Sequence, residues 1–445
     1  VKITKLMLII NALIFLALLK TCNHVQKSSF CKQHENPFFI PTASMGTRIH
    51  TSEGASAPTR LLRAVGLFTG DMRQFGEWVK RQVFIIQLLD CVLRGVAQVM
   101  FVNNPLSGLL VVIGLFVQNP WWALNGLLGT AGSTVSAVLL RLNRSDGAVL
   151  AGLHGYNGAL VGLLMAVFSA KGTWYGWLLA PNLFMSMLCP IVSSALSSVV
   201  SRWDLPVFTL PFNILVCSHI AATGSTHPYF PLHLHQNNSF ENLSLPQLFL
   251  SVPVGVGQVF GCDSPWTAGL ILLALLLCSP TICFHAILGS AAGMCVGLVL
   301  AAPHMDVYSG MWGYNSVLSC IAVGGVFYAL TWQTHVLALI CAFFCAYMTS
   351  AISKLMSVLA LPACTWPFCL STLIFLLLSS ENPAMCRLPL SSVSYPEENR
   401  HYLKQLKASG KAPTHNRVGN LQEGEANDQL EVESDPSDSV KVQEM

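Results

Sequence analysis

The chain contains the same apolar pattern twice. The segment 93–116, LRGVAQVMFVNNPLSGLLVVIGLF, is echoed 160 residues later at 253–276 by PVGVGQVFGCDSPWTAGLILLALL. The motif HGYN at 154–157 likewise returns as WGYN at 312–315. A duplication of this length predicts two similar structural halves, and apolar halves of this kind are typical of membrane proteins that enclose a path between two repeats.

Composition places these halves in a lipid bilayer. Hydrophobic residues make up 53% of the chain and charged residues only 10%, whereas about a quarter of a soluble domain is charged. No Lys or Arg occurs between Arg202 and Lys354, and so long a gap fits a segment surrounded by lipid or membrane protein. The net charge of +3 indicates no nucleic-acid partner.

The apolar core runs from about Val83 to Ser379 and divides into six stretches in each half. A membrane span normally needs about twenty apolar residues. The first stretch of the first half is shorter than this, because Asp90 and Arg94 precede and Asn103 follows its apolar run. We expect a re-entrant half-helix there and at the equivalent place in the second half. The stretches are 83–101, 105–118, 121–141, 147–170, 173–200 and 205–222, then 248–261, 265–279, 281–302, 308–330, 332–352 and 357–379.

Charge predicts the orientation of the chain. The loop between the halves has no Lys or Arg and carries glycosylation sequons at Asn237 and Asn242, so we expect it outside the cell. Both termini are then cytosolic, and each half crosses the membrane an odd number of times. The predicted fold is an all-α polytopic membrane protein of two inverted repeats, each with about five transmembrane helices plus one re-entrant half-helix. Basic residues flank the core at Arg60, Arg63, Arg73, Lys80 and Arg81 and again at Arg387, Arg400, Lys404, Lys407 and Lys411.

This reading divides the chain into five parts. Residues 1–75 form a poorly specified extension whose apolar start resembles a signal peptide, and 76–225 form the first membrane repeat. An extracellular loop at 226–247 leads to the second repeat at 248–390. The polar and acidic segment 391–445 is predicted to be a cytosolic, largely disordered tail.

The core lacks the groups that ion transport or catalysis would need. None of its acids recurs as an acid in the other half, and no catalytic triad, zinc-protease or phosphate-binding motif is present. The 15 cysteines include no CxxC pair. We therefore expect no enzyme, cofactor or metal site.

The polar groups that do recur are neutral. Gln98 and Gln258 occupy equivalent places, and an amide in hydrocarbon should face a polar path or bond a neighbouring helix. Both alternatives remain open from the sequence.

Thr209 and Thr365 occupy the same place in LPVFTLPF and LPACTWPF, whose prolines remove backbone donors. We expect the second proline of each motif to free a carbonyl one turn earlier, on Val207 and Ala363. Hydroxyl and carbonyl oxygens in a column suit a solute that is rich in N–H donors.

Aromatic residues accompany these motifs. Phe212 and Phe368 end the two proline motifs, and Phe101 lies three residues after Gln98. Flat aromatic walls beside the oxygens are one interpretation, and ordinary packing or lipid contact is the other.

Several of these segments together resemble the vertebrate urea transporters. The similar segments are NNPLSGLL, GLHGYNGALVGLLMAVFS, LPVFTLPFN, TWPFCLSTL and YPEENR, and the likeness covers about Phe75 to Tyr402. The resemblance implies a multi-pass plasma-membrane homotrimer with one channel-like pore in each protomer. By the same resemblance Gln98 and Gln258 are pore-mouth amides, Thr209 and Thr365 mid-membrane hydroxyls, and Leu160 and Leu318 an apolar constriction. One position departs from two-fold symmetry, because Gly261 stands where a partner of Phe101 would be.

Urea also suits the residues themselves, since it is neutral, planar and rich in N–H donors. A narrow, dry slot would refuse ions through the cost of desolvation. We expect passive transport of urea down its gradient. The alternatives are a coupled secondary transporter for another small neutral polar solute and a non-transporting structural protein of the bilayer.

Overall fold

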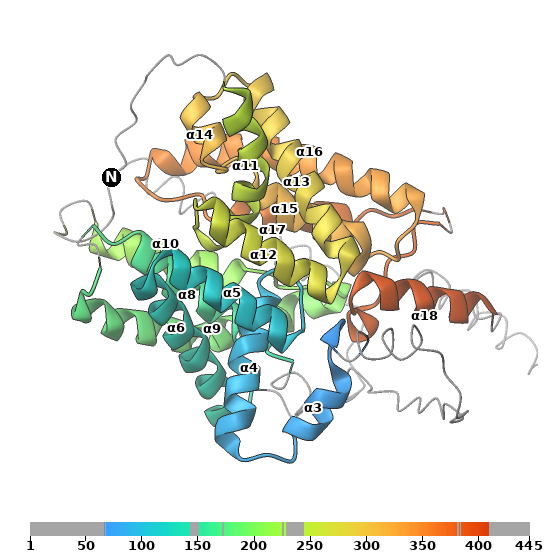
Figure 1. The fold of residues 1–445 in the computed structure, drawn as a ribbon, viewed down its shortest axis with the longest axis horizontal. Coiled ribbons are helices and arrows are strands. Elements are labelled where there is room, and N and C mark those ends of the chain that lie inside the picture. The colour runs from blue at the N-terminus through green and yellow to red at the C-terminus, as the bar shows by residue number, and fades with distance from the viewer. Residues whose placement is uncertain are drawn as a thin grey trace, which may run out of the picture.

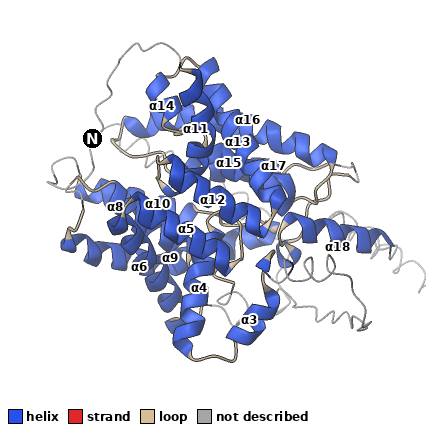
Figure 2. Ribbon diagram, in the orientation of Figure 1, coloured by secondary structure: helices blue, strands red, loops and turns tan. Residues whose placement is uncertain are grey.

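The computed structural model describes residues 66, 68–142, 151–170, 173–224, 227, 244–380, 382 and 384–408. This part of the chain is built from helices and contains no β-sheet, which confirms the all-α prediction (Figure 2). The two sequons, the start of the chain and residues 409–445 lie outside the described residues.

The helices of each half lie together, the first half in blue to green and the second in yellow to orange (Figure 1). The first half comprises α3 (Arg73–Val79), α4 (Phe84–Gln98), α5 (Pro105–Gln118), α6 (Pro120–Leu139), α8 (Tyr156–Val167), α9 (Leu179–Val200) and α10 (Leu210–Thr223). The second half comprises α11 (Leu245–Gly257), α12 (Pro265–Cys278), α13 (Pro280–Val299), α14 (His304–Tyr308), α15 (Tyr314–Ile321), α16 (Trp332–Ser357) and α17 (Trp366–Leu376), and α18 (Pro396–Ala408) follows it.

Proline and asparagine fix where several helices begin. Pro105 and Pro265 open the equivalent helices α5 and α12, where a residue without an N–H loses no helical hydrogen bond. Asn104 caps α5 by accepting hydrogen bonds from the backbone N–H groups of Leu106 and Ser107 at 2.9 and 3.1 Å. The duplicated sequence therefore starts these two helices at equivalent residues.

Helices α5 and α12 join the halves through two reciprocal hydrogen bonds. The hydroxyl of Ser107 donates to the carbonyl of Ala274 at 2.7 Å, and that of Thr267 donates to the carbonyl of Gly114 at 3.0 Å. Ser107 is equivalent to Thr267 and Gly114 to Ala274 at the offset of 160 residues. The start of each helix thus meets the end of the other, so the helices are antiparallel and a pseudo-two-fold axis runs across them.

Three helical segments in the described chain are long and apolar enough to cross a membrane alone: Gly176–Trp203, Pro280–Val299 and Trp332–Ser357. The segment Leu245–Phe260 meets Pro265–Cys278 at a bend of 77°, as a broken span or a re-entrant loop would. Long apolar helices of this kind define a polytopic membrane protein. The count of five spans and one half-helix in each repeat stays a prediction.

Four of the predicted stretches contain helices that are shorter than the stretch. In the described parts of 147–170, 205–222, 308–330 and 357–379, helices α8, α10, α15 and α17 have 12, 14, 8 and 11 residues. Each interruption lies at a repeated glycine or proline motif, where the backbone leaves the helix before the next helix begins. Helices α10 and α17 begin within the two proline motifs, at Leu210 and Trp366, where the prolines predict an irregular backbone.

The two ends of the described chain pack against each other. The Ser394 hydroxyl donates to Glu398 at 2.7 Å and to Asp71 at 3.3 Å, and Arg73 pairs with Glu398. Helix α18 places its two acids in the first turn, where the helix dipole favours negative charge. The predicted disorder of the tail is therefore wrong for 396–408.

The Asp71 carboxyl gives this contact a pH dependence. Burial, and secondly the charge of Glu398, raise its pKa from 3.8 to about 6. The folded state then holds a proton that the unfolded state releases, so stability should fall as the pH rises from about 4 to about 6. Thermal unfolding of the purified protein across this range should show a smaller fall for Asp71→Asn. Glu77→Gln, a change of an exposed acid on α3, is the control and should follow the unmodified protein; parallel curves for all three proteins would contradict the assignment.

Candidate functional site

The two halves meet in a buried polar contact between equivalent residues. The hydroxyls of Thr209 and Thr365 lie 2.6 Å apart, and each residue is only 4% exposed. Two equivalent residues can touch in this way only where they lie beside the axis that relates the halves. The sequence predicted these threonines as a pair, and the structure brings them together.

The surroundings of the two threonines are not symmetric. Asn213 accepts hydrogen bonds from the backbone N–H and the hydroxyl of Thr365, both at 2.9 Å. Its equivalent in the second half is Cys369, whose sulfur lies 3.3 Å from the Thr209 hydroxyl. Because an amide replaces a weakly polar thiol on one side only, the second-half threonine is held more firmly.

The predicted free carbonyls of Val207 and Ala363 are not free. The Val207 carbonyl accepts the backbone N–H of Leu210, and the Ala363 carbonyl accepts that of Trp366, each at 3.2 Å. Since α10 and α17 begin only after these turns, the second proline of each motif sits in a first helical turn and removes no helical bond. That prediction is wrong for both residues.

A different pair of carbonyls marks the breaks, and tyrosines bind them. The hydroxyl of Tyr156 donates to the Phe208 carbonyl at 2.6 Å, and the hydroxyl of Tyr314 donates to the Cys364 carbonyl at 2.8 Å. Phe208 and Cys364 have the left-handed φ values of +50° and +43°, which are costly for residues with a side chain. The tyrosine of each GYN motif thus donates a hydrogen bond to the carbonyl that the strained turn of the following proline motif exposes.

The asparagines of the GYN motifs contact the same carbonyls. Asn157 and Asn315 each donate to them at 3.3 Å. The side-chain oxygen of Asn157 also accepts the backbone N–H of Phe212 at 3.2 Å. The corresponding oxygen of Asn315 is buried and accepts no hydrogen bond from the described residues.

Gln98 and Gln258 lie at equivalent helix ends with equivalent partners. The side-chain NH₂ of Gln98 donates to the Ala151 carbonyl at 3.1 Å, and that of Gln258 donates to the Ser309 carbonyl at 2.8 Å. Both side chains are half-buried, and their carbonyl oxygens accept no hydrogen bond in the described part of the chain. The amides therefore bond the neighbouring turns with one end and keep an acceptor at the other.

Glycines allow this approach. A Cβ on Gly155 would lie 3.2 Å from the Cα of Gly95, and one on Gly313 would lie 3.1 Å from the Cα of Gly255. Helices α4 and α11 therefore touch the turns before α8 and α15 backbone to backbone. This closeness brings each glutamine within reach of its carbonyl partner.

Four phenylalanines form a cluster beside the threonines. Phe101 makes edge contacts with Phe208, Phe327 and Phe368, with ring centroids 5.9 to 6.2 Å apart. Phe208 lies 4.9 Å from Phe368 by the same measure. Of the three predicted aromatics, Phe101 and Phe368 come together, whereas Phe212 is buried in α10 without a ring contact among the described residues.

The missing partner of Phe101 has a steric explanation. Gly261 has a φ of +69°, close to the +62° of Phe101, so the two turns share one conformation. A Cβ on Gly261 would lie 3.4 Å from Val167 and 3.6 Å from Leu164, both on α8. These are ordinary contacts for a Cβ, so a side chain at this position would grow from a point that already touches α8, and the aromatic cluster is one-sided.

Leu160 and Leu318 are each 1% exposed and belong to the same buried apolar cluster as the phenylalanines. Each follows its GYN tyrosine by one helical turn and so lies on the same helix face. Their role as a constriction stays a prediction.

Sequence reasoning missed several residues of this centre. Tyr156 and Tyr314 could have been found, because the GYN motif recurs in both halves. Recurrence could not identify Phe208, Phe327 and Asn213, since each has a different residue at the equivalent position of the other half.

The centre joins two antiparallel halves, and its hydroxyls, amides and phenyl rings carry no charge. An uncharged polar centre between membrane repeats is typical of a transporter or channel for a neutral solute rather than an enzyme.

Comparison with known proteins identifies the family of transporters to which the chain belongs. The urea transporter family matches residues 89–380. Urea transporter 1 of Ovis aries is 51% identical over 386 residues, which cover 85% of this chain and 99% of that protein. Urea transporter 1 of Mus musculus is 54% identical over 358 residues, covering 79% and 93%. The chain therefore belongs to the urea transporter family, and it is a transporter and not an enzyme.

The tyrosine contacts can be tested by removing single hydroxyls. Tyr156→Phe and Tyr314→Phe should each lower the free energy of unfolding by about 1 kcal/mol, because each leaves a strained carbonyl without its best donor. Tyr347→Phe, on the exposed face of α16, should change it by less than about 0.5 kcal/mol. Thermal unfolding in detergent measures all three. Equal stability of the three variants would show that the hydroxyls do not support the turns.

Proposed function

We propose that this protein lets urea cross the membrane passively, down its gradient, along a path past Thr209 and Thr365. The observation that carries the proposal is the contact of these two hydroxyls beside the two-fold axis. Polar groups at that depth need partners, and here the Thr209 hydroxyl bonds the Thr365 hydroxyl, which also donates to Asn213. A solute that offers N–H donors and one carbonyl can replace this bond without leaving either hydroxyl unsatisfied.

Further acceptors extend from this centre. The side-chain oxygens of Gln98 and Gln258 and the buried oxygen of Asn315 accept no hydrogen bond from the described residues. Urea has four N–H donors, so these oxygens match the water partners that it loses on entering. Phe101 and Phe368 would supply the flat apolar walls for a planar molecule, and Leu160 and Leu318 the narrow, dry segment.

The same neutrality argues against ion coupling. Asp90 and Arg94 pair with each other at 2.8 Å on α4, and Arg94 also donates to the Asn103 carbonyl. This pair is buried and its two charges oppose each other, although the Asp90 Oδ1 has no hydrogen-bond partner among the described residues, and the pair has no counterpart in the second half. A coupled secondary transporter for another small neutral solute is the alternative, and it would need an ion site that the threonine centre does not contain.

We further propose a plasma-membrane homotrimer with both termini cytosolic and the loop 226–247 outside. The antiparallel packing of α5 and α12 supports inverted repeats, since a two-fold axis across membrane helices lies in the membrane plane.

Asn237 or Asn242 should then carry glycan. Digestion of intact cells with a glycosidase should shift the mobility of the protein, and the double Gln variant should show no shift; cleavage of this loop only from the cytosolic side would contradict the orientation.

The threonine pair can be tested by isosteric substitution. Thr209→Val with Thr365→Val keeps the shape but removes both hydroxyls, so urea flux into vesicles should fall about thirtyfold if each hydroxyl contributes roughly 1 kcal/mol to the dehydrated solute. A single Thr365→Val leaves the Asn213 oxygen with fewer donors and should also lower stability. Stopped-flow measurement with equal amounts of folded protein decides the matter. Unchanged flux in the folded double variant would reduce the pair to helix packing.

A further inference from the structure

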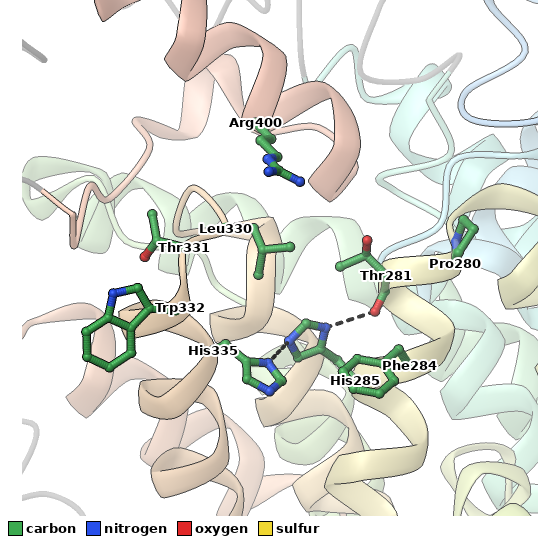
Figure 3. Close-up of a pocket in the computed structure, with 9 residues that line it drawn as sticks. All are labelled: Pro280, Thr281, Phe284, His285, Leu330, Thr331, Trp332, His335 and Arg400. Atoms are coloured by element: carbon green, nitrogen blue, oxygen red, sulfur yellow. Dashed lines mark hydrogen bonds between the residues drawn. The ribbon is translucent and has the colours of Figure 1, made fainter.

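A cavity lies away from the threonine centre, where α13 and α16 begin and α18 passes over them (Figure 3). Its volume is about 530 Å³. Helices α13 and α16 are two of the three segments able to cross a membrane alone. Because both begin at the cavity, it lies at the boundary between lipid and water.

A chain of hydrogen bonds runs along one wall of this cavity. His285 Nδ1 lies 2.9 Å from the Thr281 carbonyl, which can only accept, so Nδ1 carries the proton. The other ring nitrogen of His285 then accepts from His335 Nδ1 at 3.1 Å. This arrangement leaves Nε2 of His335 as the ring nitrogen that a ligand can reach.

The Arg400 guanidinium lines the opposite side of the cavity. Arg400 extends from α18 toward the cavity and makes no hydrogen bond or ion pair with any described residue (Figure 3). The nearby acid Glu397 makes no ion pair with Arg400 among the described residues, and its carboxylate accepts from the Ser279 hydroxyl at 2.6 Å and from the Thr281 N–H at 3.1 Å. The cavity therefore offers one unpaired positive charge and lacks a lining carboxylate.

The lipid side of the cavity is apolar. Trp332 is 73% exposed and Phe284 is 52% exposed, and Phe284 stacks on His335 with ring centroids 5.8 Å apart. Tryptophan at the end of a span is typical of the headgroup level of a bilayer. A ligand here would meet a cation at its polar end and aromatic rings at its apolar end.

We propose that this cavity binds the headgroup of an anionic phospholipid, with the phosphate region at Arg400, a headgroup N–H donor at His335 Nε2, and the acyl chains along Trp332 and Phe284. The charge and the two-ended chemistry of the cavity favour a lipid over free phosphate, which would leave the aromatic side empty. By the proposed orientation the lipid belongs to the cytosolic leaflet, where anionic lipids are concentrated. The site is separate from the threonine centre and does not depend on the transported solute.

The test uses the full-length protein in phosphatidylcholine vesicles, with phosphatidylserine or phosphatidylcholine brominated near the headgroup. Bromine quenches nearby indole fluorescence, and the difference between the unmodified protein and Trp332→Phe isolates the signal of Trp332. At equal bromine content, phosphatidylserine should be enriched roughly fivefold at Trp332, the ratio expected for one basic side chain at the membrane surface. Arg400→Gln should abolish this preference.

Lys404→Gln is the matched control, since it removes the same charge from the same helix at an exposed residue that does not line the cavity. It should retain the preference, and millimolar inorganic phosphate should not displace the lipid. Equal quenching by the two lipids, equal loss in both variants, or displacement by phosphate would overturn the proposal. Trp332 shielded from both lipids would indicate that a second copy of the chain covers the cavity and would overturn it too. Urea flux, measured on the same vesicles, reports separately on the transport proposal.

Discussion

The antiparallel contact of α5 with α12 is the constraint on which the remaining structure depends. Its two hydrogen bonds, from Ser107 and from Thr267, join equivalent atoms in opposite directions. This arrangement fixes a two-fold axis across the helices, so any residue close to the axis faces its own equivalent. Thr209 and Thr365 are such residues. A duplicated sequence thereby produces a pair of identical polar groups in the middle of an apolar protein.

The polar centre lies where the backbone leaves the helical conformation before α10 and α17. The backbone groups exposed at these two breaks need hydrogen-bond partners. The left-handed turns at Phe208 and Cys364 expose carbonyls that hydrocarbon could not solvate. The hydroxyls of Tyr156 and Tyr314 bind these carbonyls, so each break of one motif is completed by the other motif of the same half. The cost of the strained turns is thus offset locally, and the hydroxyls and amides at the centre keep fixed orientations.

The sequence predicted the parts of this arrangement that the repeat itself encodes. The all-α membrane fold and the equivalence of Thr209 with Thr365 followed from the repeat. Their direct contact did not, because equivalent residues meet only where they lie beside the axis. The free carbonyl of Val207 was predicted wrongly, since the position of a proline within a helix depends on where the helix starts. The contact of Phe101 with Phe327 could not be predicted, because it joins residues that are not equivalent and depends on tertiary packing alone.

The neutral centre should conduct a neutral solute without coupling to ions. One measurement tests this most directly. Isotopic urea uptake would be followed in vesicles that contain the purified protein, with and without gradients of protons, sodium and membrane potential. The account predicts rapid equilibration to equal concentrations on both sides, unaffected by any gradient and without electrical current. Accumulation of urea above the external concentration when an ion gradient is supplied, or a current that depends on urea, would contradict it.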